Sequence, residues 1–143
     1  MTIKSVAVSA LSLALATAAH AVEPNINPGM WETTSTITLK SAQFSMPART
    51  ETNSECLTSE QVAEGQAFLE QDGDCTFAKK DLRADGMDYA MTCKTPEGGT
   101  VDLNASMQFK GESMTGTIDG TMGTPMGEMT MNIVLSGQRK GGC

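Results

Sequence analysis

The sequence predicts a mainly β protein: a single antiparallel, curled up-and-down sheet of about seven strands, half-barrel or barrel-like, with one short helix and two disulfides. Three observations carry this prediction. Apolar and polar residues alternate between Thr100 and Leu135, the first 21 residues have the pattern of an export signal, and four cysteines follow that signal. Alternation with a period of two is typical of a strand with one dry and one wet face.

The clearest alternation lies in the last third of the chain. Its apolar members are Val101, Leu103, Ala105, Met107 and Phe109 in one run and Met129, Met131, Ile133 and Leu135 in another. Polar residues occupy most of the positions between them. Gly111-Glu112 predicts a tight turn after the first run, and residues 123–127 predict the loop before the last strand.

Residues 1–21 have the features of a secretory signal peptide. Lys4 gives a positive start, Val6 to Ala18 is apolar, and Ala19-His20-Ala21 is a small-x-small cleavage site. The apolar run is too short to span about 30 Å of hydrocarbon as a helix. We therefore expect cleavage after Ala21, a single exported domain over residues 22–143, and no integral membrane association after cleavage.

The composition argues against two classes of function. The formal net charge is −7, and an acidic chain repels phosphate backbones, so we expect no nucleic-acid partner. Cleavage would also remove His20, the only histidine, and with it Ser-His and Cys-His nucleophilic pairs. No Gly-x-Ser-x-Gly, phosphate-loop or Ser-x-x-Lys motif is present. We therefore predict that the protein is not an enzyme and has no catalytic residues.

The first strand is expected from Met30 to Lys40, with Trp31, Thr33, Ser35, Ile37 and Leu39 on one face. Threonine is frequent in this segment, which favours a strand over a helix. Trp31 is the only tryptophan. We expect it to anchor the core at one end of the sheet, with a ligand-stacking platform as the alternative.

A weaker strand is expected over residues 43–54. Pro47 cannot donate to a ladder, so this strand should lie at an edge or carry a bulge. Thr58 or Ser59 is suited to cap a helix that reaches about Glu70, and Gln61 completes a capping box if Thr58 is the cap.

Residues 75–82 and 87–93 predict a hairpin around Ala84-Asp85-Gly86. With the strands between residue 100 and the end of the chain, this segment completes the expected sheet. The helix between the second and third strands is placed to cover the open side of a curled sheet.

Four cysteines remain after cleavage: Cys56, Cys75, Cys93 and Cys143. An even number behind a signal peptide indicates two disulfides, whereas a zinc site is disfavoured because no two of them are close in sequence. If the helix carries the chain to the far end of the sheet, the pairs are Cys56–Cys143 and Cys75–Cys93. If it does not, three cysteines crowd one pole and Cys143 is left alone.

Methionine is unusually frequent, at 11 residues. The spacing of Met122, Met126, Met129 and Met131 resembles thioether clusters that hold Cu(I), a soft ion that prefers soft ligands. The alternative is that methionine fills an irregular core in a chain with only 4% aromatic residues. Met126, between a proline and a glycine, is the one that packing explains least.

Three functions stay open at this point. The favoured one is a non-catalytic binding module for an apolar ligand or a protein partner, without a cofactor; the others are a Cu(I)-binding protein and a structural envelope protein. The residues expected to line a ligand site are Trp31, Tyr89, Met91, Met107, Phe109, Met129 and Met131.

Several short motifs resemble the bacterial domain-of-unknown-function family 3617. They are Pro28-Gly29-Met30-Trp31-Glu32, Cys56-Leu57-Thr58, Asp74-Cys75, Thr92-Cys93 and the closing Ser136-Gly137-Gln138-Arg139-Lys140-Gly141-Gly142-Cys143. The resemblance covers the whole of residues 22–143. It implies an exported protein, periplasmic in a Gram-negative bacterium, and it brings no established activity, cofactor or catalytic residue.

Overall fold

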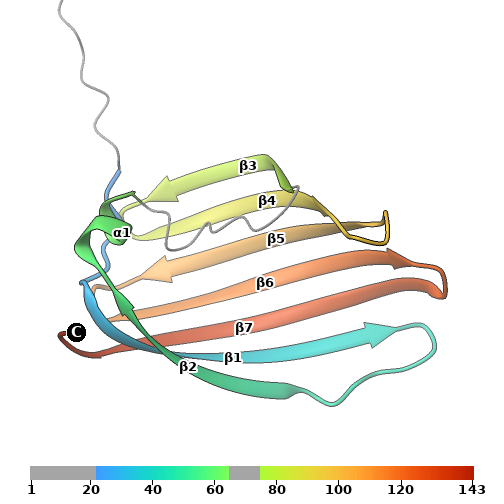
Figure 1. Cartoon of the computed structure of the whole chain (residues 1–143), viewed down its shortest axis with the longest axis horizontal. Helices are drawn as coiled ribbons and strands as arrows, with labels where there is room; N and C mark the ends of the chain where they lie inside the picture. The colour runs from blue at the N-terminus through green and yellow to red at the C-terminus, as the bar shows by residue number, and fades with distance from the viewer. Residues whose placement is uncertain (1–21, 65–74) are drawn as a thin grey trace, which may run out of the picture.

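The computed structural model describes residues 22–64 and 75–143. The expected signal peptide and the expected continuation of the helix to Glu70 lie outside these residues. Within them, the chain forms one sheet of seven strands and one helix (Figure 1). The elements are β1 (Gly29–Ser41), β2 (Arg49–Leu57), α1 (Ser59–Glu64), β3 (Cys75–Arg83), β4 (Gly86–Lys94), β5 (Thr100–Phe109), β6 (Ser113–Thr124) and β7 (Gly127–Gly141).

The strand order is that of an up-and-down barrel opened along one seam. It runs β2-β1-β7-β6-β5-β4-β3, and every neighbouring pair is antiparallel. Each strand except β2 therefore pairs with the next along the chain, and β7 pairs with β1. β2 and β3 do not pair with each other and form the two edges. The predicted curled, antiparallel sheet is confirmed, and it is a half-barrel because it does not close.

The alternation in the sequence decides which side chains lie inside the curl. One row across the sheet joins Ile37, Ile133, Ile118, Ala105 and Tyr89, each opposite the next on a neighbouring strand. The intervening residues are mostly threonine, serine, asparagine and aspartate, and they lie on the outer face. The sheet therefore has an apolar concave face and a polar convex face.

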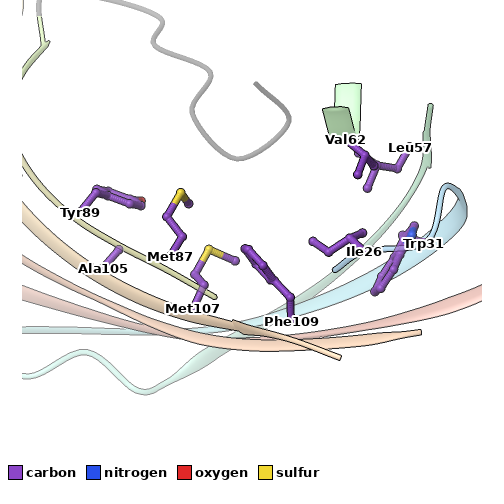
Figure 2. Packing of buried hydrophobic residues seen from close by; sticks show 9 residues of the cluster. All are labelled: Ile26, Trp31, Leu57, Val62, Met87, Tyr89, Ala105, Met107 and Phe109. Carbon is purple, nitrogen blue, oxygen red and sulfur yellow. The ribbon is translucent and has the colours of Figure 1, made fainter. Parts of the chain in front are cut away.

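The best-buried part of the core lies at the end of the sheet where α1 sits (Figures 1 and 2). Trp31 is only 1% exposed and Val62 of α1 only 2% exposed, and Ile26 and Leu57 belong to the same cluster. The indole Nε1 of Trp31 donates to the carbonyl oxygen of Asn27 at 2.9 Å. Trp31 is thus the predicted core anchor at one end of the sheet.

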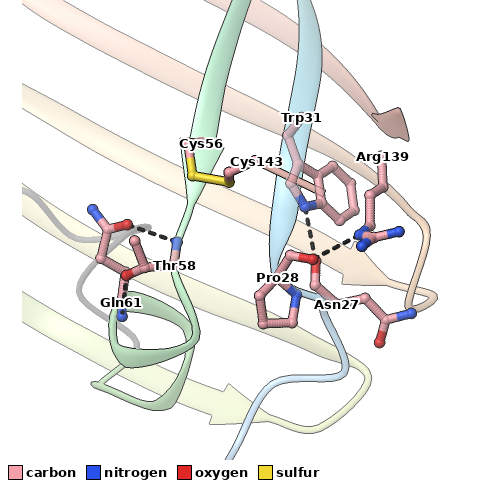
Figure 3. Close-up of a disulfide and its surroundings, with 8 residues drawn as sticks. All are labelled: Asn27, Pro28, Trp31, Cys56, Thr58, Gln61, Arg139 and Cys143. Atoms are coloured by element: carbon pink, nitrogen blue, oxygen red, sulfur yellow. Dashed lines mark hydrogen bonds between the residues drawn. A yellow bond between two sulfur atoms is a disulfide. The ribbon is translucent and has the colours of Figure 1, made fainter. Parts of the chain in front are cut away.

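The start of α1 follows the predicted capping box. The backbone N–H of Thr58 donates to Oε1 of Gln61 at 2.9 Å, and the backbone N–H of Gln61 donates to Oγ1 of Thr58 at 3.2 Å (Figure 3). Thr58 rather than Ser59 is therefore the cap. This short helix closes one end of the half-barrel and does not cover its length.

Two expected boundaries were wrong. The second strand begins at Arg49 and ends at Leu57, not at residues 43 and 54, because pairing with β1 starts only after Pro47, which lacks an N–H. The loop expected at residues 123–127 is shorter, because Thr124 pairs with Gly127 and its hydroxyl donates to the Gly127 carbonyl at 2.6 Å.

The disulfides join Cys56 to Cys143 and Cys75 to Cys93, as strand direction predicted. Cys56 lies near the end of β2, at the same pole as the end of β7 (Figure 3). Cys75 and Cys93 are direct partners in the β3–β4 ladder at the opposite pole. The first bond spans 87 residues of sequence and joins the edge strand β2 to the segment that follows β7.

Candidate ligand-binding site on the concave face

A pocket of about 280 Å³ opens on the concave face. Every strand except β3 contributes to it. The lining residues are Trp31, Thr33, Asn53, Glu55, Leu57, Tyr89, Met107, Met114, Ile118 and Leu135. Its size lies near the lower end of the range of about 300–1,000 Å³ that is usual for small-molecule sites.

Of the residues that the sequence predicts to line a ligand site, Trp31, Tyr89 and Met107 contribute to this pocket. Phe109 lies on the same face but is 2% exposed and belongs to the core. The remaining three, Met91, Met129 and Met131, lie on the same face but closer to the opposite pole, and they do not line the pocket.

Sequence reasoning missed the contribution of β6, which supplies Met114 and Ile118. Gly116 and Gly120 occupy two other inward positions of this strand, so its apolar alternation is weak in the sequence. The signal that could have found Ile118 is its position between these glycines in an otherwise threonine-rich strand. Leu135 was visible in the alternation of the last strand, but nothing local linked it to Trp31.

The inward glycines and methionines fit together across neighbouring strands. A Cβ on residue 137 would stand 2.7 Å from Cε of Met114, and one on residue 116 would stand 3.0 Å from Cγ of Met107. These methionines thus occupy the space that the glycines leave. Met107 is buried, which confirms core filling for this residue.

The β1–β2 side of the pocket is polar. Oγ1 of Thr33 is buried and has no hydrogen-bond partner among the described residues. Its neighbour across the ladder is Asn53, and Glu55 is opposite Trp31. A buried hydroxyl without a partner costs about 1–3 kcal/mol. The pocket therefore combines an apolar wall with a polar edge, where Asn53 and Glu55 are exposed and the Thr33 hydroxyl is buried.

The opposite wall carries no charge at neutral pH. Burial raises the pKa of the Tyr89 phenol above its usual value, because the ionised form would lose hydration. Tyr89 therefore presents a neutral aromatic ring, which also packs edge-on against Phe77 with ring centroids 6.1 Å apart.

An ionic cluster holds the segment before β1 against the end of the sheet. Nδ2 of Asn27 donates to Oε1 of Glu112 at 2.6 Å, and Nε of Arg139 donates to the carbonyl oxygen of Pro28 at 2.7 Å. The hydrogen bond from Asn27 and the nearby charge of Arg139 lower the pKa of Glu112. This cluster positions the loop that leads into Trp31 (Figure 3).

Residues 22–64 and 75–143 contain neither a metal centre built from His, Cys, Asp or Glu side chains nor a membrane-spanning helix. In these ranges, no three His, Cys, Asp or Glu side chains gather in a way that could hold a metal ion. The helix that they contain is too short to cross a membrane.

The fold and the site define a class of protein: a small, disulfide-bonded, antiparallel half-barrel with an apolar concave face and a pocket within it. The chain matches the family described as "Protein of unknown function (DUF3617)" over residues 26–143, and it belongs to this family. No curated protein and no solved structure matches the chain.

Proposed function

We propose that this protein is a non-catalytic periplasmic binding module whose concave face holds an amphipathic molecule with an apolar chain. The observation that carries the proposal is the incomplete burial of the apolar face. The apolar side chains that lie on this face and remain only half-buried include Ile37, Leu39, Val101, Leu103, Ile118, Met131 and Ile133.

Exposed apolar surface of this kind supports a bound ligand. Contiguous apolar patches on a monomer commonly mark interaction sites, and covering them gains about 25 cal/mol per Å². The curvature of the sheet favours a slender small molecule over a flat protein surface, because a chain can follow the inside of the curl (Figure 1). A protein partner is therefore the less favoured occupant.

The polar edge of the pocket supports an amphipathic ligand rather than a plain hydrocarbon. The Thr33 hydroxyl can donate or accept one hydrogen bond, and Asn53 and Glu55 stand beside it. A hydroxyl, amide or amine at one end of the ligand would satisfy these groups. The apolar chain would then extend over Ile118 and Leu135 toward the far pole.

Ligand occupancy can be tested directly and with a probe. Native mass spectrometry of gently purified protein should reveal a co-purified small molecule. N-phenyl-1-naphthylamine, an apolar dye, should gain fluorescence on binding, and a single-chain amphiphile should displace it. Ile118→Gln should weaken dye binding at least tenfold, because it places an amide on the apolar wall.

Thr117→Gln is the matched control, since Thr117 is exposed on the convex face of the same strand. It should leave dye binding unchanged. A clean unliganded mass together with no dye binding would contradict the proposal and favour a structural role. A co-purified polypeptide in place of a small molecule would favour a protein partner.

Thr33→Val should have opposite effects on stability and on binding. Valine is close in size to threonine and removes the unpaired hydroxyl, so the free energy of unfolding should rise by about 1 kcal/mol. The affinity for an amphiphile with a hydroxyl head should fall, while the affinity for the dye should not. Urea unfolding and dye displacement measure the two effects, and a loss of stability would show that the hydroxyl has a partner in the fold.

A further inference from the structure

The rim of the concave face at the pole of the Cys75–Cys93 bond carries three methionines that lie outside the ligand pocket. Met122 of β6 lies directly opposite Met129 of β7, and Met131 follows two residues along β7 on the same face. Opposite residues in an antiparallel pair have Cβ atoms about 4.5–5.5 Å apart, and diagonal neighbours are about 7–8 Å apart. The Cβ atoms of the three methionines are therefore close enough for their flexible thioether side chains to meet.

Met131 lies directly across the ladder from Gly120 and packs over it. A Cβ on residue 120 would stand 3.1 Å from Cε of Met131, so the end of this side chain crosses from β7 to lie over Gly120. Gly120 and Met122 are neighbours on the same face of β6. Because Gly120 has no side chain, the end of Met131 can lie on the β6 side of the ladder, two residues from Met122.

We propose that Met122, Met129 and Met131 bind a single Cu(I) ion. Thioether sulfur is a neutral, soft ligand that suits Cu(I) and is a poor ligand for Zn²⁺, Mg²⁺ or Ca²⁺. The flanking residues in the same row are Ser41 and Val101, so the ladder brings no carboxylate onto this face beside the sulfurs. All three methionines are half-buried, which leaves a path for the ion from solvent.

Met126 is not required for this site. It lies in the two-residue turn between β6 and β7 and is 73% exposed. The proposed site is also distinct from the ligand pocket, which none of the three methionines lines. Failure of one proposal therefore leaves the other standing.

A competition titration tests the proposal with the disulfides intact. Residues 22–143 would be titrated without oxygen or thiols, with Cu(I) supplied as its acetonitrile complex and bicinchoninate as the competing chelator. The wild type should take one equivalent of Cu(I). Met122→Leu and Met129→Leu should each weaken binding at least tenfold, because leucine keeps the apolar volume and removes the sulfur.

Met114→Leu and Met126→Leu are the controls. Met114 is another half-buried methionine that packs over a glycine on the same face, and Met126 is a highly exposed one. Both variants should bind Cu(I) within twofold of the wild type. Equal losses in the controls, or no competition by the wild type, would overturn the proposal.

A second test uses only the wild-type protein, so it does not depend on whether the variants fold. Ag(I) is soft and redox-inert, and it can be added to wild-type protein whose methionine methyl groups carry ¹³C. The methyl resonances of Met122, Met129 and Met131 should shift, whereas those of Met30 and Met114 should stay in place. Shifts spread evenly over all methionines would show unspecific binding and refute the site.

Discussion

Trp31→Ala is expected to lower the free energy of unfolding by about 3–5 kcal/mol, the usual cost of truncating a buried aromatic side chain to alanine. Trp31 is 1% exposed and packs in the cluster that includes Ile26, Leu57 and Val62. These residues come from the segment before β1, from β2 and from α1. Loss of the indole should therefore loosen every element that closes this end of the half-barrel.

The loss would also remove a hydrogen bond, since the indole Nε1 donates to the Asn27 carbonyl. Trp31→Phe is the control for this contribution. Phenylalanine keeps most of the apolar volume, so it should cost clearly less than alanine. Urea unfolding should be followed by circular dichroism, because the variants lack the only tryptophan. A cost below about 1 kcal/mol for Trp31→Ala would show that this end does not hold the fold together.

Gly29→Ala is expected to lower the free energy of unfolding by about 2–6 kcal/mol, from a strained backbone and an overpacked contact together. Gly29 has φ = +147°, which side chains other than glycine rarely adopt. A Cβ at this position would overlap the carbonyl oxygen of Gly141 and stand 2.6 Å from Nε of Arg139. The carbonyl belongs to the β1–β7 ladder and cannot move away without breaking it.

Gly142→Ala is the matched control for Gly29→Ala. A Cβ there would meet nothing within 4 Å, so this variant should unfold like the wild type. The Cys56–Cys143 bond gives a second measurement, because Gly141 lies just before Cys143. Free-thiol titration of refolded Gly29→Ala should show incomplete oxidation of this pair, and full oxidation with wild-type stability would contradict the prediction.

Local sequence patterns were enough to predict much of the fold. Alternation in β5 and β7 was enough to define their inward faces, although the exposed Val134 interrupts it in β7. The Thr58 and Gln61 pair was enough to start α1. The direction of the strands also favoured the observed cysteine pairing, on the condition that the chain crosses to the far end of the sheet between the second and third strands. These features depend on neighbours in sequence or on the up-and-down path of the chain, so composition and order alone could predict them.

The pocket could not be predicted in the same way, because its lining residues are brought together by contacts between strands that are distant in the sequence. Ile118 and Leu135 line it together with Trp31, although Leu135 is more than a hundred positions from Trp31 in the sequence. The glycines of β6 weakened the apolar pattern that marks its inward face. The Thr33 hydroxyl has no hydrogen-bond partner among the described residues, which only the placement of its neighbours shows. The packing of Met131 over β6 likewise depends on the missing side chain at Gly120.

The sequence by itself therefore determined most of the strands, their inward faces and the helix cap, because each rests on residue spacing, and it favoured the observed disulfides without excluding another pairing. Only the tertiary structure decided that the sheet stays open between β2 and β3. Whether the sheet closes into a barrel depends on the twist and stagger summed over all seven strands. The sequence of any single strand does not determine this sum. The same accumulated curvature produces the half-exposed apolar face from which the proposed binding function follows.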